Sequence, residues 1–220
     1  MLHAFCIFAF AFGSRVSEVA IKELYTNQWA DLHFYLLGKE VDVLATGPSG
    51  CYLFEPDELE AIQQADETTR GGRGVPRSHT LNTLDHEWCV VRVLCSLKRD
   101  LALVGMAGPT DPVFSWAPAK GVTRKMAGEV LKVAAVACGI PAADVSCHSL
   151  RSGAMTAFRA AGIPWAETKM FLRWKSDSAA DLYNWPHTKL VAGKAAQIFS
   201  SAPIHRLRGL FVHCLGGSSA

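Results

Sequence analysis

CHSLRSGAMTAFRAAGIPWAETKMFLRWKSDSAADLYNW, residues 147–185, is the stretch that decides the fold of this chain. It places His148, Arg151, Trp174 and Tyr183 at offsets of 0, 3, 26 and 35 residues. His148 and Arg151 stand three residues apart at a predicted helix start, so both side chains lie on one face of that helix. An imidazole, a guanidinium, an indole and a phenol in this order indicate a site that holds a phosphodiester and attacks it with tyrosine.

The helix start itself is suited to bind a phosphate group. Ser146 is a suitable N-cap residue, and free backbone amides, the positive end of the helix dipole and a bidentate guanidinium all favour an anion. Taken alone, His-x-x-Arg is also the pattern of a capping histidine and a solvated arginine. The residues C-terminal to this motif favour a site: residues 161–164 break the helix, Ser176 or Asp177 caps the next one, and Tyr183 lies about two turns into it.

The segment resembles the C-terminal half of the catalytic domain of tyrosine recombinases, the phage integrase family. That family carries His-x-x-Arg, then a histidine or tryptophan, then the nucleophilic tyrosine nine residues later, and Trp174 and Tyr183 are nine residues apart. The phrase LRWKSDSA is similar to the version in eukaryotic DIRS-type and Crypton-type mobile elements. The resemblance covers about residues 5–195. It implies an α+β, mainly α catalytic domain with a small antiparallel β-sheet near the N-terminus.

The family's active site also contains an earlier arginine, which corresponds to Arg15 in the sequence Gly13-Ser14-Arg15-Val16-Ser17-Glu18. Glu18 lies one helical turn on, where its carboxylate can pair with the guanidinium of Arg15 and hold it in place. Alone, the pair is an ordinary surface salt bridge; with the C-terminal motif, it favours an active-site arginine.

The resemblance implies cleavage and rejoining of DNA through a 3′-phosphotyrosyl intermediate on Tyr183. Arg15 and Arg151 would stabilise the negative charge on the phosphate oxygens, with His148 and Trp174 as further donors. A phenol is a weak nucleophile at neutral pH, so either His148 takes its proton or the cationic site lowers its pKa. Tryptophan only donates. Because bond energy is conserved, no cofactor and no metal are expected.

The lysine that acts as general acid in this family is hard to place. Lys39 lies 24 residues after Arg15, but after the first predicted strand. In the register set by residues 71–74 and 89–94, Gln64 stands at the lysine position, and glutamine cannot serve as a general acid. Two hypotheses therefore stay open: a working recombinase, and a catalytically decayed or domesticated DNA-binding remnant of the same fold.

Double-stranded DNA is the expected partner. Arg173 and Lys175 flank Trp174, and Arg70 and Arg73 lie in a glycine-rich stretch, so these four are the predicted DNA contacts. The resemblance further implies a homo-oligomer assembled on DNA. The family's N-terminal DNA-clamp domain has no counterpart in residues 1–220, so a separate clamp partner is expected.

The composition fits a folded protein with one good-sized core, with 220 residues, 50% hydrophobic, and a net charge of +2. Residues 55–67 hold six acidic and no basic residues, whereas residues 151–194 hold seven Lys or Arg against three Asp or Glu. An anionic partner should therefore meet the C-terminal half. The seven cysteines are odd in number and lack metal spacing. They indicate free thiols and an intracellular protein, nuclear if the source is eukaryotic.

The apolar run at residues 2–12 admits two interpretations. No basic residue precedes Arg15, and 11 residues are too short to span a bilayer. We therefore expect a buried core helix and no membrane association. The alternative is the signal peptide of a secreted helical protein, cleaved near Ala11 or Gly13.

Hydrophobic periodicity and turn residues predict the remaining elements. Strands are expected at residues 29–37 and 41–44, joined by a turn at Gly38-Lys39. Residues 46–74 should form a long loop or extended hairpin with a short helix near 57–64, and residues 108–118 a loop. Helices are expected at 2–12, 15–25, 88–99, 123–138, 148–161, 164–173, 177–185 and 189–199. Residues 1–200 would form the catalytic domain and residues 201–220 a disordered tail.

Overall fold

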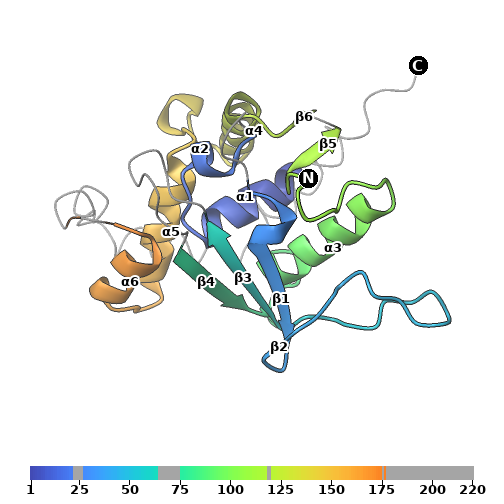
Figure 1. Ribbon diagram of the computed structural model, residues 1–220. Coiled ribbons are helices and arrows are strands. Elements are labelled where there is room, and N and C mark those ends of the chain that lie inside the picture. Colours follow the sequence, from blue (N-terminus) through green and yellow to red (C-terminus); the bar gives the residue numbers. More distant parts are fainter. Residues whose placement is uncertain (22–26, 64–74, 118–119, 175, 177–220) are drawn as a thin grey trace, which may run out of the picture. The chain divides into compact units, whose positions relative to one another are not determined.

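A computed structural model describes residues 1–21, 27–63, 75–117, 120–174 and 176 (Figure 1). Within these residues the chain forms six α-helices and two small antiparallel sheets, an α+β fold as predicted. The chain falls into two compact units, Met1–Arg124 and Lys125–Ala220. That residues 1–200 act as one catalytic domain stays a prediction.

A four-stranded antiparallel sheet forms the framework of the first unit (Figure 1). The strands lie in the order β2-β1-β3-β4, and one face is buried because alternate side chains of a strand point to opposite faces. Leu32, Phe34, Leu59 and Ala61 are on the buried face. The strands are β1 (Leu32–Leu36), β2 (Lys39–Glu40), β3 (Glu58–Gln63) and β4 (Val75–Thr80).

Helix α1 (Leu2–Ala11) lies in the core of this unit and packs against α3 (Val90–Ala102). Phe5 and Phe8 are fully buried, and their rings lie 5.3 and 5.6 Å from the ring of Phe114. The predicted buried core helix is thus confirmed, and cleavage near Ala11 would remove it from the core. In the described ranges, no helix combines the length and the apolar character needed to cross a bilayer.

The first hairpin differs from the prediction by its register. Leu36 pairs with Lys39, so the turn is Leu37-Gly38 and the second strand is β2, not residues 41–44. Leu37 and Gly38 have φ of 53° and 74°. A two-residue turn with two positive φ values matches the right-handed twist of the flanking strands. Because leucine rarely adopts this conformation, the sequence predicted the turn at Gly38-Lys39, one residue later than it is.

The prediction of a helix near residues 57–64 is wrong, because Glu58–Gln63 is the strand β3. Its sequence, ELEAIQ, is rich in helix formers, but pairing with β1 on one side and β4 on the other overrides that local preference. The strand β4 contains Pro76, which cannot donate a ladder hydrogen bond and is tolerated because β4 is an edge strand. The predicted loop at 108–118 contains β5 (Ser115–Ala117), which pairs with β6 (Lys120–Gly121).

The helix predicted at residues 15–25 is also shorter than expected. Helix α2 spans Val16–Val19 only. Ala20 is extended, with φ −65° and ψ 147°, and the next amide, of Ile21, donates to the Val122 carbonyl at 3.0 Å. This backbone pairing replaces further helical turns. Between α2 and β1 lies the 3-10 helix η1 (Trp29–Asp31).

The helices of the second unit match the predictions within a few residues. Helix α4 (Arg124–Ala137) begins at its boundary, and α5 (Ser149–Ala160) and α6 (Trp165–Phe171) follow the 3-10 helix η2 (Ala142–Asp144). The helices predicted at 177–185 and 189–199 and the tail at 201–220 lie outside the described residues.

Candidate active site

The turn that precedes Arg15 explains why the motif begins with glycine. Gly13 has φ 54° and follows the C-cap of α1. Its amide donates to the Phe10 carbonyl at 3.0 Å, and the amide of Ser14 donates to the Ala9 carbonyl at 2.8 Å. These two bonds form a Schellman motif, in which a left-handed residue stops the helix. A residue with a Cβ would be strained at position 13.

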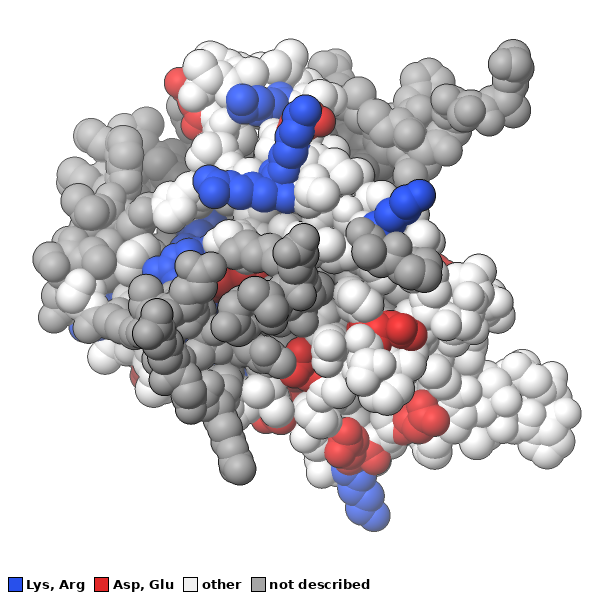
Figure 2. Space-filling view, turned by 45° about the horizontal axis from the view of Figure 1, so that its top comes forward, with Lys and Arg blue, Asp and Glu red and all other residues white. Residues whose placement is uncertain are grey.

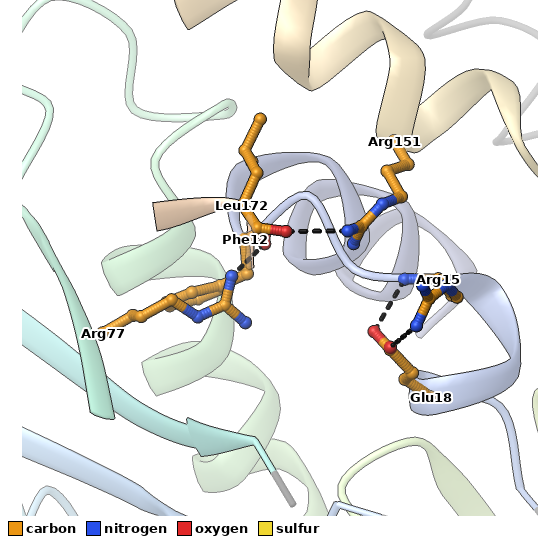
Figure 3. Close-up of polar contacts among 6 residues, drawn as sticks. All are labelled: Phe12, Arg15, Glu18, Arg77, Arg151 and Leu172. Atoms are coloured by element: carbon orange, nitrogen blue, oxygen red, sulfur yellow. Dashed lines mark hydrogen bonds and ion pairs between the residues drawn. The ribbon is translucent and has the colours of Figure 1, made fainter. Parts of the chain in front are cut away.

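Arg15 is the N-cap residue of α2, and Glu18 holds both ends of it (Figure 3). The Arg15 amide donates to Glu18 Oε2 at 2.9 Å, and its Nη1 lies 3.0 Å from Glu18 Oε1. The Glu18 side chain is 7% exposed and that of Arg15 is 45% exposed. The predicted pair is therefore confirmed: a buried carboxylate orients a half-exposed guanidinium.

The strand β4 brings two basic side chains to the end of α1 that the sequence analysis did not single out. Arg77 donates to the Phe12 carbonyl, and His79 Nε2 lies 2.9 Å from the Ala11 carbonyl (Figure 3 for Arg77). The available signal was their spacing, since residues two apart in a strand lie on the same face. This spacing is informative only within a strand, and no strand was predicted at Val75–Thr80.

In the second unit, α5 begins one residue after the predicted helix boundary at residue 148. Its N-cap residue is His148, not Ser146, and the helix starts at Ser149. The Ser146 hydroxyl still accepts the His148 amide at 3.2 Å, and the Ser149 hydroxyl accepts the Ser146 amide at 3.0 Å. These bonds hold the predicted helix start, with His148 exposed.

The structure brings Arg151 and Trp174 together within this unit. Arg151 is 1% exposed, and its guanidinium carbon lies 4.4 Å from the centre of the Trp174 ring. Its Nη2 donates to the Leu172 carbonyl at 2.7 Å (Figure 3). Leu172 is the C-cap of α6, so the cation meets the negative end of a helix dipole. A stacking contact of this kind contributes about 0.5–2 kcal/mol.

A second Schellman motif presents Trp174 to Arg151. The Arg173 amide donates to Met170 O at 3.2 Å, and the Trp174 amide donates to Lys169 O at 2.9 Å. Arg173 occupies the left-handed position, with φ 57°, where glycine is the usual residue. The backbone at this predicted DNA contact is therefore strained, and strain of this kind is often found at functional sites.

Lys39 is not placed beside Arg15. It belongs to β2, at the end of the sheet remote from α2 (Figure 1). In Figure 2, acidic side chains gather at the lower edge of the view, the side on which Figure 1 shows β2. Glu40, Glu58 and Glu60 all lie close enough to Tyr35 to influence its titration. This end of the sheet disfavours a phosphate.

Tyr35 is a poor candidate for the nucleophile. Burial, and then the carboxylates of Glu60, Glu40 and Glu58, raise the pKa of the Tyr35 phenol, which opposes nucleophilic activation.

Other predicted site residues lie outside the described residues: Tyr183, Lys175, Arg70, Arg73 and Gln64. Arg15 belongs to the first unit and His148, Arg151 and Trp174 to the second, so the convergence of all five catalytic residues stays a prediction. Among the described residues, no group of three or more His, Cys, Asp and Glu could hold a metal ion.

Comparison of the chain with family models, with curated proteins and with solved structures gave no match in any of the three. The resemblance to tyrosine recombinases therefore depends on the sequence motif, and membership of that family stays a prediction.

Proposed function

We propose that this chain cleaves and rejoins DNA as the catalytic domain of a tyrosine recombinase, with Tyr183 as nucleophile. The observation that carries the proposal is the contact between Arg151 and Trp174, two motif residues 23 positions apart whose side chains meet at 4.4 Å. A motif that arose by coincidence would not be expected to place its members in contact. The orientation of Arg15 by a buried Glu18 supports the proposal independently.

In the proposed reaction, the Tyr183 hydroxyl oxygen attacks the phosphorus of a DNA phosphodiester. The bond from phosphorus to the 5′ oxygen breaks, leaving a 3′-phosphotyrosyl enzyme and a free 5′ hydroxyl. The phenol proton passes to a base, a role for which His148 has a suitable side chain because imidazole can accept a proton, and the leaving oxygen takes a proton from an acid. Attack by a 5′ hydroxyl reverses these steps and rejoins the strand.

In this scheme Trp174 would have two tasks. Its ring provides a flat surface on which the Arg151 guanidinium lies, which fixes the plane of the N–H donors. Its indole N–H can donate to phosphate, but it cannot accept a proton. Trp174→Phe keeps the ring and removes the donor, and we expect the cleavage rate to fall by about 10²-fold.

A nicked suicide DNA substrate tests the proposal. Cleavage of such a substrate releases a short strand, so the covalent intermediate accumulates and is seen as a band of reduced mobility in a denaturing gel. We expect an adduct with the natural chain and with Tyr35→Phe, and none with Tyr183→Phe. An adduct that persists in Tyr183→Phe, or that disappears in Tyr35→Phe, would contradict the assignment of the nucleophile.

The second candidate function is a DNA-binding remnant of the same fold without catalysis. It is favoured by the position of Lys39 at the acidic end of the sheet, remote from α2 (Figure 1). A remnant would bind double-stranded DNA with a steep salt dependence and form no adduct under any condition. Binding without an adduct would select this function, and an adduct dependent on Tyr183 would exclude it.

A further inference from the structure

Arg77 is a buried cation at the end of α1. It is 5% exposed, donates from Nη1 to the Phe12 carbonyl, and places its guanidinium carbon 5.3 Å from the centre of the Phe12 ring (Figure 3). Phe12 is the C-cap of α1, where the helix carbonyls lack intrahelical partners. Arg77 therefore supplies a charged hydrogen bond to a group that the helix itself cannot satisfy.

His79 makes a matching contact from the same face of β4. Its Nε2 lies 2.9 Å from the carbonyl of Ala11, the last residue of α1, and its ring meets the Phe12 ring edge-on at 4.8 Å. A carbonyl only accepts, so Nε2 carries the proton in this contact. Arg77 and His79 together fix two successive carbonyls at the end of α1 to the sheet.

Only two residues separate this fixed end from Arg15. Gly13 is left-handed, Ser14 is fully buried, and both amides are bonded back into α1. The chain from Phe12 to Arg15 is about 10 Å long at most. Because both intervening amides are hydrogen-bonded to α1, a shift at Phe12 would also move Arg15. The guanidinium of Arg15 is in turn held by Glu18 on the next turn.

We infer that Arg77, assisted by His79, is a positioning residue for Arg15: it fixes the end of α1 and thereby places the Arg15 guanidinium for phosphate. This inference rests on the proposed function for its catalytic consequence, although the mechanical link can be measured without DNA.

Hydrogen exchange of the Gly13 and Ser14 amides tests the mechanical link. In Arg77→Met both amides should exchange about tenfold faster or more, since a hydrogen bond to a charged group has been lost. Arg99→Met is the matched control. Arg99 is also a nearly buried arginine, and it bonds the Val43 and Phe54 carbonyls at 3.1 and 2.5 Å, away from the α1 turn. It should leave the two amides unchanged.

The suicide-substrate assay tests the consequence for catalysis. At saturating DNA the cleavage rate of Arg77→Met should fall about tenfold or more, while the Kd for DNA stays unchanged. Arg77→Lys keeps one donor and loses the planar group, so its cleavage rate should lie between the rates of the natural chain and of Arg77→Met. A merely structural role would instead lower activity only in step with the unfolded fraction, measured by urea titration at the assay temperature.

Each outcome decides one question. Unchanged exchange in Arg77→Lys and Arg77→Met, or equal acceleration in Arg99→Met, overturns the inference, and the lysine variant decides alone if the methionine variant does not fold. A natural chain that forms no adduct overturns the proposed function, and the exchange rates then still show whether Arg77 fixes the turn.

Discussion

Replacing Arg173 by glycine should remove a backbone strain from the second unit. Arg173 is left-handed, with φ 57°, at the position after the C-cap of α6. For a residue with a Cβ this conformation costs about 1–2 kcal/mol, and glycine adopts it freely. Glycine loses about 0.5–1 kcal/mol through the greater freedom of its unfolded chain. At the midpoints of these two ranges, the backbone term favours glycine by about 0.75 kcal/mol.

Arg173→Ala is the matched control, because it removes the same side-chain contacts but keeps the strain. The difference between the two variants isolates the backbone term, whatever the arginine side chain itself contributes. We expect the free energy of unfolding of Arg173→Gly to exceed that of Arg173→Ala by about 0.5–1 kcal/mol. At about 2–4 °C per kcal/mol, the Tm of the glycine variant should be about 1–4 °C higher. Urea titration followed by circular dichroism measures it. An alanine variant as stable as the glycine variant would refute the strain.

Three further perturbations concern the first unit. Leu37→Asn should raise the free energy of unfolding by about 1 kcal/mol, because asparagine tolerates the left-handed turn, whereas Leu37→Val should lower it; urea midpoints decide. Burial and, to a lesser extent, the charge of Arg77 lower the pKa of His79 below 6.5, whereas the hydrogen bond to the Ala11 carbonyl raises that pKa by less. The unfolded chain therefore binds this proton at a higher pH than the folded chain, so the contribution of His79 to stability is fully present above pH 6.5 and is lost as the pH falls below it. His79→Gln should make the free energy of unfolding less dependent on pH in this range. Part of the pH dependence should remain, because the pKa of His3 is lowered too. Glu18→Gln should lower stability by about 1 kcal/mol or less, yet slow suicide-substrate cleavage by about tenfold, and equal cleavage rates would remove its orienting role.

The helices could be predicted because their signals are local. Apolar spacing of three and four residues marked α3, α4 and α5, and glycine marked the ends of α1 and α4. The strands β3 and β4 could not be found in this way. Glu58–Gln63 becomes a strand through pairing with β1, more than twenty residues earlier, and with β4 after it. No window of sequence contains that information.

The site divides along the same line. The pair of Arg15 and Glu18 could be predicted, since three residues of chain fix its geometry. The partners of Arg77 could not, because Phe12 and Arg77 are 65 residues apart in sequence. Arg151 and Trp174 were placed in one site only through the family resemblance, and their actual contact, a guanidinium on an indole face, has no signal in the spacing.

Two of the predicted active-site segments begin at the same kind of turn, and the difference between the turns is informative. Gly13 occupies the left-handed position after α1, and Arg15 follows two residues later at no cost in backbone strain. Arg173 occupies the corresponding position after α6, directly before Trp174. If that turn served only to end α6 and present the indole to Arg151, glycine would do so at lower free energy. An arginine at this position indicates that the contacts of its side chain offset the backbone strain, and the proposed contact with DNA phosphate is a further role that a guanidinium can fill and glycine cannot.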